Sequence, residues 1–362
     1  MSNKVPKIRF NGYSDAWVQR NLGEVVDVKS GRDYKHLSEG DIPVYGTGGY
    51  MLSVDEALSQ NDDAIGIGRK GTIDNPYLLR APFWTVDTLF YAIPRVGFDL
   101  NFTFDIFQKV NWRKLDESTG VPSLSKATIN SVSAAVPSED EQIKIGGLFE
   151  KIDNLIAANQ HKLDLLKEQK KGYLQKMFPK NGAKVPELRF AGFADDWVQR
   201  KLADVVSISA GGDVDKTKLI EDGGYPVLAN ALTNSGIVGY YDSYKVEAPA
   251  VTVTGRGDVG HAVARHVNFT PVVRLLSLKS EVLDADFLAN MLNQTNILVE
   301  STGVPQLTAP QLGSYKILYP NLNEQTKIGK LLNAFDNLIA ANQRKLDLLK
   351  KQKKGYLQKM FV

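Results

Sequence analysis

Two stretches of the chain carry apolar residues at alternating spacings of three and four. This is the 3.5-residue period of a coiled coil, in which a stripe on one helix packs against a partner helix. Each stripe carries an asparagine at the same step, where a polar residue fixes the register at some cost in stability. The first seam is Phe149, Ile152, Ile156, Asn159, Leu163, Leu166, Lys170, Tyr173 and Met177, and the second is Leu332, Phe335, Ile339, Asn342, Leu346, Leu349, Lys353, Tyr356 and Met360.

The two seams lie in copies of one segment. Asp153–Phe178 returns almost letter for letter as Asp336–Phe361, and Val5–Leu22 returns in similar form as Val185–Leu202. The protein is therefore a tandem of two similar halves, each ending in a long helix. Burying both seams against each other is the simplest arrangement, and a helix of about 40 residues would be about 60 Å long.

A helix-start signal precedes each seam. Ser138 is followed three residues later by Glu141, and Asn321 by Glu324. In such a capping box the first side chain accepts a hydrogen bond from a free backbone N–H and the Glu returns one. The pattern predicts helices beginning at about 138 and 321.

The regions before these helices alternate apolar and polar residues in short runs broken by Gly, Pro, Asn and Asp. This rhythm is typical of irregular, mainly β structure. The second half keeps the rhythm with different residues, which indicates one constant frame that holds two different binding domains. We expect a β domain at 1–137, a helix at 138–180, a second β domain at 181–320 and a second helix at 321–362.

Composition narrows the class of protein. The 362 residues are 43% hydrophobic and 23% charged, with a net charge of +3 and no Cys. No apolar run approaches the roughly 18 to 20 residues that span a bilayer, and the first residues lack a secretory apolar core. We expect a cytoplasmic protein without disulfides, membrane segments or thiolate-bound metal. The mild positive charge permits an anionic partner without requiring one.

Several motifs imitate catalytic or cofactor sites. Gly66–Gly71 and Gly255–Gly260 fit the dinucleotide pattern GxGxxG, but neither is followed by the helix that the pattern requires. Asn75-Pro76-Tyr77 resembles part of a methyltransferase tetrapeptide but lacks its second Pro, and we interpret it as a turn. The four His have no metal-ligand spacing. Trp17 and its copy Trp197 are better explained as core anchors than as base-stacking residues. The chain is predicted to be non-catalytic and to bind no metal.

The combination of features resembles the specificity subunit of type I restriction-modification systems. Each half has a Trp-x-x-x-x-Leu opening, a Gly-Arg turn, a Ser-Thr-Gly-Val-Pro segment (118–122 and 301–305) and a Pro-x-x-x-Glu-Gln start to its long helix. The resemblance implies an α+β fold with two mainly β target recognition domains, separated by an antiparallel two-helix coiled coil. It implies that each domain reads half of a split double-stranded DNA target. It also implies that the coiled coil docks two modification subunits and, where present, a restriction subunit; S-adenosylmethionine, ATP and Mg²⁺ would bind only to partners.

Base reading requires polar side chains presented from tight turns, with glycine allowing close approach to phosphates. We equate Gly68-Arg69 with Gly255-Arg256, so Arg69 and Arg256 are expected to be counterparts. A structural arginine bracing its own turn is the simpler alternative for Arg69 and Arg256, and a coiled-coil adaptor that binds protein or glycan is the alternative for the whole chain. The candidate DNA-binding residues are Arg69, Lys70, Thr72, Thr47 and Tyr50 in the first half, and Arg256, Asp258, Asn230, Thr233 and Asn234 in the second.

Overall fold

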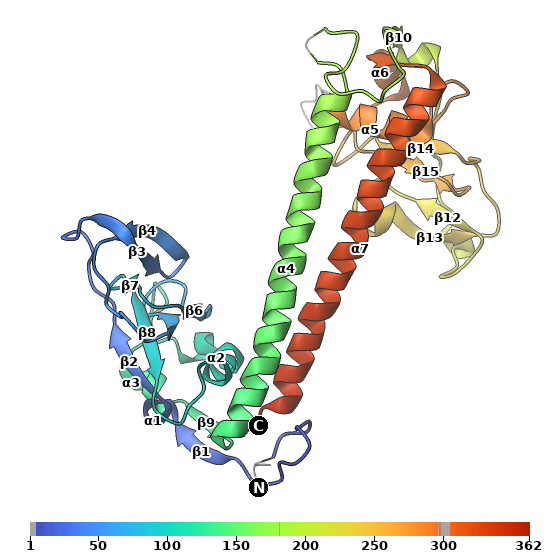
Figure 1. Ribbon diagram of the computed structural model, residues 1–362. Coiled ribbons are helices and arrows are strands. Elements are labelled where there is room, and N and C mark those ends of the chain that lie inside the picture. The colour runs from blue at the N-terminus through green and yellow to red at the C-terminus, as the bar shows by residue number, and fades with distance from the viewer. Residues whose placement is uncertain (1–4, 181, 296, 298–304) are drawn as a thin grey trace. The chain divides into compact units, whose positions relative to one another are not determined.

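The computed structural model describes residues 5–180, 182–295, 297 and 305–362. The chain divides into two compact units (Figure 1), and each unit contains part of both long helices. Unit 1 comprises residues 1–160 and 344–362, and unit 2 comprises residues 161–343. No helix within the described part of the chain is long and apolar enough to cross a membrane.

Both units are built from short strands and a few helices. In unit 1 these are β1 (Val18–Asn21), α1 (Leu22–Val25), β2 (Val26–Ser30), β3 (Glu39–Gly46), β4 (Gly49–Val54), β5 (Ala64–Gly68), β6 (Tyr77–Leu79), β7 (Trp84–Thr85), β8 (Leu89–Pro94), α2 (Leu100–Lys109), η1 (Trp112–Leu115), α3 (Lys126–Ser131) and β9 (Ser133–Val136). In unit 2 they are β10 (Val198–Lys201), η2 (Leu202–Asp204), β11 (Ser207–Ala210), η3 (Lys216–Lys218), β12 (Tyr225–Leu228), η4 (Thr233–Gly236), β13 (Ile237–Tyr241), β14 (Ala250–Thr254), β15 (Ala262–Arg265), β16 (Thr270–Pro271), β17 (Leu275–Lys279), α5 (Ala285–Gln294), α6 (Ala309–Gly313) and β18 (Lys316–Tyr319). The long helices are α4 (Glu139–Met177) and α7 (Leu322–Met360).

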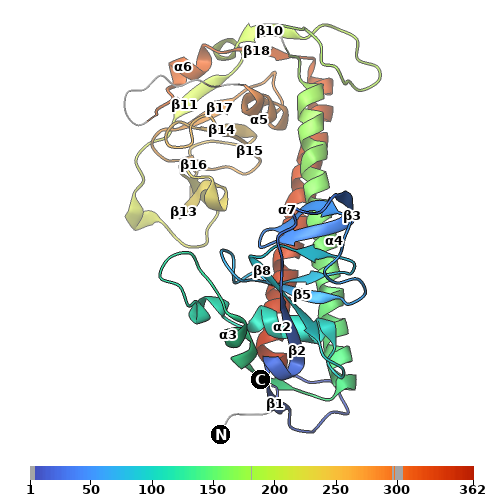
Figure 2. The same cartoon turned by 90° about the vertical axis from the view of Figure 1, so that its left-hand side faces the viewer.

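The two units share one sheet topology. Unit 1 has a four-stranded sheet in the order β2-β8-β5-β6 and a three-stranded sheet in the order β4-β3-β7, and unit 2 repeats them as β11-β17-β14-β15 and β13-β12-β16 (Figure 2). A two-stranded ribbon, β1-β9 or β10-β18, closes each domain. The tandem repeat predicted from the helices therefore extends to the β domains, although their residues differ.

The long helices pair in antiparallel fashion within each unit (Figures 1 and 2). In unit 1, Lys353 Nζ of α7 lies 2.6 Å from Asp153 Oδ1 of α4. In unit 2, Lys170 of α4 contacts Asp336 of α7 at 2.5 Å. These pairs are copies of each other with the helices exchanged, as a pseudo-two-fold repeat requires. Each seam lysine is mostly buried and neutralised by the facing helix.

The seam side chains face inward. Phe149, Leu163, Leu332 and Leu346 are each at most 1% exposed, and most of the other seam residues are partly buried. Asn159 is 7% exposed, and its Nδ2 donates to the Leu155 carbonyl of its own helix. Asn342 repeats this bond with Leu338. These bonds satisfy the buried amides locally, so a role for the asparagines in register stays a prediction.

The long helices begin where the sequence predicts, but the capping box is half formed at α7, and at α4 the Glu141 N–H donates to the Ser138 backbone carbonyl instead of to its side chain. Asn321 Oδ1 accepts from the Glu324 backbone N–H at 3.1 Å, as expected. Glu324 does not return the bond, because both of its carboxylate oxygens accept from the Arg189 guanidinium at 2.7 and 2.8 Å. Glu141 is held in the same way by Arg9. The second half of the predicted box is therefore wrong, since a charged partner displaces the weaker backbone bond.

Each domain packs its core on a ten-residue helix that the sequence analysis placed among strands. Asp99 Oδ1 caps α2 by accepting from the Phe102 N–H at 2.8 Å, and Asp284 caps α5 identically at 2.9 Å. Trp17 and Trp197 are both 2% exposed, which confirms that they are core anchors. The aromatic cluster of unit 1 joins Trp17, Phe102 and Phe361, and that of unit 2 joins Trp197, Phe287 and Phe178.

Candidate nucleic-acid interface

The Gly-Arg turn of unit 1 follows the buried strand β5 and is packed too tightly for a side chain. A Cβ added to Gly68 would lie 2.0 Å from the Thr72 carbonyl oxygen. Gly255, which follows β14, would similarly meet the Arg274 carbonyl oxygen at 2.2 Å. Glycine is therefore required at both positions. The tight backbone fixes the position of the cation that follows each glycine, Arg69 or Arg256.

Backbone pairing corrects the alignment of the two turns. Lys70 forms a bridge with Ser123, and Arg256 forms the corresponding bridge with Gln306. The Leu124 N–H donates to the Arg69 carbonyl, whereas that of Leu307 donates to the Gly255 carbonyl. Lys70 is therefore the structural counterpart of Arg256, and Arg69 is the counterpart of Gly255. The predicted pairing of Arg69 with Arg256 was wrong by one residue, because strand register rather than the shared Gly-Arg letters fixes the equivalence.

The second candidate loop of each unit lies against the turn. In unit 1, Thr47 Oγ1 lies 3.8 Å from the Cβ position of Gly71. Tyr77 supports this contact from β6, because its hydroxyl donates to the Gly46 carbonyl at 2.5 Å; burial raises the pKa of this hydroxyl. In unit 2, Asn230 Oδ1 accepts from the Gly255 N–H at 2.8 Å. Two loops that are distant in sequence thus form one surface in each domain.

The candidate side chains differ in their exposure and in the hydrogen bonds that they form. Lys70, Thr72, Arg256, Asp258 and Thr233 are exposed. Arg69 is also exposed and lies over Phe90, with Nη1 3.4 Å from the Asp87 carbonyl, which is a weak bond.

The two asparagines of the second loop are instead used by the fold. Asn230 donates to the Val273 carbonyl in addition to its bond with Gly255, so its amide braces the turn. Asn234 has a left-handed backbone with φ 49°, and its Nδ2 donates to the Ile237 carbonyl. Direct base reading by either amide would compete with these bonds.

Arg265 joins the same loop from β15. Its Nε donates to Thr252 Oγ1 at 2.9 Å and its Nη1 donates to the Ser235 carbonyl at 3.0 Å. Burial lowers the pKa of Arg265 to about 10. This arginine positions the loop, a role that no local sequence signal indicates.

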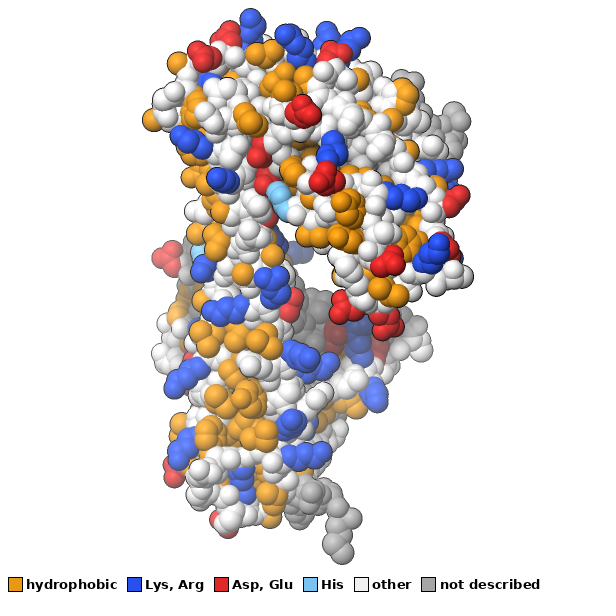
Figure 3. Space-filling view, turned by 90° about the vertical axis from the view of Figure 1, so that its right-hand side faces the viewer, with side chains coloured by type: hydrophobic (Ala, Val, Ile, Leu, Met, Phe, Trp, Pro, Cys, Tyr) orange, Lys and Arg blue, Asp and Glu red, His pale blue; other side chains and the backbone are white. Residues whose placement is uncertain are grey.

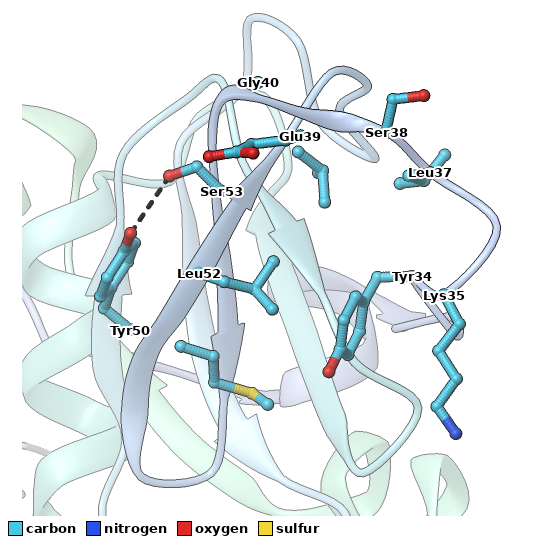
Figure 4. Close-up of a pocket in the computed structure, with 11 residues that line it drawn as sticks. Tyr34, Lys35, Leu37, Ser38, Glu39, Gly40, Tyr50, Leu52 and Ser53 are labelled. Atoms are coloured by element: carbon cyan, nitrogen blue, oxygen red, sulfur yellow. Dashed lines mark hydrogen bonds between the residues drawn. The ribbon is translucent and has the colours of Figure 1, made fainter.

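Tyr50 lines a different surface of unit 1. It stands on β4 at the rim of a hollow of about 730 Å³, with residues from the 34–40 segment (Figure 4). Its hydroxyl lies 3.2 Å from Ser53 Oγ and its ring is 63% exposed. Among the described residues, no hydrogen bond, ion pair or ring contact joins Tyr50 to Arg69 or Lys70. The structure therefore does not bring this candidate into the Gly-Arg turn.

The segments that resemble cofactor-binding motifs form strands and turns of the fold. Strand β6 follows Gly66–Gly71 and strand β15 follows Gly255–Gly260, so neither glycine pattern opens a helix that could meet a pyrophosphate. Tyr77 of the Asn-Pro-Tyr motif is committed to the Gly46 carbonyl. Within the described ranges, no group of three or more His, Cys, Asp or Glu side chains could hold a metal ion.

Comparison with known proteins identifies the family. The family model for the type I restriction modification DNA specificity domain matches the chain twice, over residues 14–168 and 194–351. The chain belongs to this family. Both matched regions contain a Gly-Arg turn with its neighbouring loop.

Individual specificity proteins are similar over much of the chain. The type I restriction enzyme MjaVIII specificity subunit of Methanocaldococcus jannaschii is 24% identical over 273 residues, covering 66% of this chain and 63% of that protein. A Mycoplasma pneumoniae protein named as a type I specificity subunit is 24% identical over 257 residues, covering 66% of each. The chain thus spans slightly less than two thirds of these relatives.

A solved specificity structure has the same fold. The crystal structure of the S subunit of a type I restriction-modification system from M. genitalium matches with a TM-score of 0.76 over 99% of both chains, at 15% identity. The specificity-domain architecture, two tandem domains of mixed helix and strand, is therefore shared with that protein.

Proposed function

We propose that this chain is the DNA sequence-recognition subunit of a type I restriction-modification complex. Each β domain would read one half of a bipartite duplex target, and the paired long helices would set the unread spacer. The adaptor alternative is not favoured, because the family match covers both halves of the chain.

The observation that carries the proposal is a cation at the same backbone position in two otherwise different domains. Lys70 and Arg256 are both exposed beside a glycine-tight turn, and both turns are joined to a second polar loop. Lysine and arginine can contact guanine edges in the major groove or phosphates of the DNA backbone. Two domains that both carry a cation at this position, but differ in the surrounding residues, are suited to reading two different half-sites.

Apolar side chains left exposed on the long helices support a docking role. Leu155 and Leu338 are repeat copies and are 52% and 49% exposed, while Leu165 and Leu348 are copies at 50% and 56%. Unit 1 contains Leu155 and Leu348, and unit 2 contains Leu165 and Leu338. Figure 3 shows one face of the molecule, with apolar side chains in patches among lysines and arginines. A repeated surface of this kind suits two copies of one modification subunit.

The chemistry would reside in those partners. We propose that S-adenosylmethionine binds to the modification subunits, and that ATP and Mg²⁺ serve a restriction subunit where one is present. The specificity chain itself would then need only to bind and position DNA, and the complex would act in the cytoplasm, where its DNA substrate lies.

Mapping methylated bases tests recognition directly. The chain is expressed with its modification subunit in a host lacking other methylation, and modified bases are read by single-molecule sequencing. A split motif with a constant gap is expected. Lys70→Ala should relax one half of the motif and Arg256→Ala the other, while Lys114→Ala, a change at another exposed lysine of unit 1, should alter neither. Absence of any motif, with partners bound, would refute the proposal.

Counting bound partners tests docking. Leu155→Arg with Leu348→Arg should remove one modification subunit from the purified complex. Adding Leu165→Arg and Leu338→Arg should remove the second. Native mass spectrometry gives the count, and full occupancy in the fourfold variant would exclude this surface.

A further inference from the structure

A cleft beside the turn that carries Lys70 gathers positive charge from two segments of unit 1. Its volume is about 540 Å³, and none of its lining residues is acidic. The lining residues are Ser30, Arg69, Lys70, Phe90, Ser123, Leu124, Ser125 and Lys126. The sequence indicates only two of the three cations, because Lys126 lies far along the chain from the turn.

The cations of this cleft are available to a ligand. Lys70 and Lys126 are exposed, and neither forms an ion pair with any described residue. Among the described residues, Arg69 makes one long hydrogen bond, to the Asp87 carbonyl, and lies over the Phe90 ring. The hydroxyls of Ser30 and Ser123 have no side-chain hydrogen bond within the described part of the chain, whereas Ser125 is committed to Glu117 and Thr128.

The backbone holds the cleft in place. The Leu124 N–H donates to the Arg69 carbonyl at 2.9 Å and the Gly71 N–H donates to the Pro122 carbonyl at 2.8 Å. Ser125 caps α3 by accepting from the Thr128 N–H at 3.1 Å, which fixes Lys126 as the first helical residue. Glu117 stands at the rim, where its carboxylate accepts the Ser125 hydroxyl.

The equivalent positions of unit 2 have lost most of this charge. Ala309 follows the cap residue Thr308 as Lys126 follows Ser125. Ala210 pairs with Leu276 on the neighbouring strand as Ser30 pairs with Phe90. Gly255 replaces Arg69, which leaves Arg256 as the only cation at the equivalent positions.

A compact cluster of cations and free hydroxyls, with no carboxylate among its lining residues, suits a singly charged phosphodiester oxygen. We propose that Lys126 and Arg69 of this cleft in unit 1 each neutralise one phosphate of the DNA backbone, and that unit 2 lacks the matching contacts. The inference rests on the proposed function. It makes the two half-sites electrostatically unequal, with unit 1 as the salt-sensitive anchor.

The salt dependence of DNA binding tests the proposal. The chain is purified with its modification subunits, and affinity is measured from 50 to 200 mM salt on a duplex carrying the methylated motif and on an unrelated duplex of equal length. Each phosphate contact contributes about 0.9 to the slope of log affinity against log salt. Lys126→Ala should lower the slope by about 0.9 on both duplexes. Between 50 and 200 mM salt, the variant should therefore lose about threefold less affinity than the wild type. Lys126→Arg should restore the slope.

A matched gain in unit 2 makes the test two-sided. Ala309→Lys places a cation at the equivalent position and should steepen the slope by about 0.9. An unchanged slope in Lys126→Ala, in a complex whose wild type still binds its motif, overturns this inference and leaves the proposed function intact. Loss of partner assembly without a slope change would also overturn it, because the cleft would then contact protein. A wild-type complex that binds no DNA would instead refute the proposed function.

Discussion

Arg9 and Glu141 form a bidentate ion pair that ties the N-terminal segment of unit 1 to the first turn of α4. The two bonds measure 2.7 and 2.8 Å, and the Glu141 side chain is fully buried. Arg189 and Glu324 repeat the pair at the start of α7. The N-terminal segments also reach the ends of the opposite helices, through Ile8 to the Lys359 carbonyl and Leu188 to the Lys176 carbonyl. Each segment thus joins two helix ends within its own unit.

Arg9→Ala should destabilise the protein strongly. It leaves a buried carboxylate without its partner, which typically costs about 3 to 5 kcal/mol. Arg20→Ala is the matched control, because its pair with Glu24 is about half exposed and screened by solvent, so it should contribute much less. Denaturant unfolding of both variants measures the difference. Equal effects would show that the buried pair has no special role in stability.

Asp105→Asn should stabilise the protein, increasingly so as pH rises. Burial raises the pKa of Asp105 well above its ordinary value, with Asp153 and Asp99 acting in the same direction and Lys353 opposing them. The native state therefore holds a proton that the unfolded state releases, and native stability falls as pH rises from the ordinary pKa through the native one. The equivalent residue of α5 is Asn290, a neutral isostere. Thermal unfolding from pH 5 to 8 should show a flatter profile for the variant, and parallel profiles would contradict this reasoning.

Asp116→Asn should show the opposite sign. Backbone N–H groups of Ser123 and Ser118 donate to this carboxylate and lower its pKa. Its stabilising effect is present above the ordinary pKa and is lost as pH falls through the lowered one. The variant should therefore be less stable at neutral pH and approach the wild type in acid. A uniform offset at all pH values would assign its effect to packing instead.

Gly68→Ala should disrupt the first recognition turn. The new methyl group would overlap the Thr72 carbonyl oxygen, and forced overpacking typically costs about 1 to 3 kcal/mol. Gly255→Ala should do the same in unit 2. Gly147→Ala is a suitable control, because its Cβ would meet nothing within 4 Å. Methylation mapping should show one half of the motif relaxed in each turn variant and the control unchanged.

Lengthening both long helices should widen the spacer. Four residues, about one helical turn, are inserted after Ala157 and at the repeat position after Ala340. The insertions stand at repeat positions, so both helices lengthen equally; the half-sites should stay the same while the tolerated gap increases. Wild-type spacing in an assembled complex would exclude the helices as the ruler. The unmodified target is expected to have half-sites about 10 base pairs apart, centre to centre.

The sequence predicts the long helices well because their signals are local and repeated. Alternating apolar spacing, cap residues and near-identical copies all concern neighbours within a few turns. Helix α2 was missed because Leu100–Lys109 alternates phenylalanine with polar residues like a strand, and only the Asp99 cap marks its start. Its copy α5, preceded by Asp284, carries a clearer helical pattern, so comparing the two halves could have revealed both.

The candidate site is harder to predict because it depends on pairing between distant segments. Lys70 matches Arg256 only through bridges to Ser123 and Gln306, which no letter comparison of the turns reveals. Lys126 enters the cleft because Leu124 pairs with Arg69. The sequence shows that Ser118–Leu124 is repeated as Ser301–Leu307, but residues 301–304 lie outside the described part of the chain. Asn230 resembled a base reader by type and position, yet its amide is used to brace the turn.

The aromatic cluster of unit 1 bears on the order in which the protein forms. Phe361 stacks on Phe102 at 5.3 Å and meets Trp17 at 6.0 Å, so the core of the first domain needs a residue that is synthesised after the whole of unit 2. Unit 2 needs no such delay, because Phe178, Trp197 and Phe287 follow one another within a single continuous stretch. During synthesis the second recognition domain can therefore mature first, while the first waits with an incomplete core for the end of α7 to arrive.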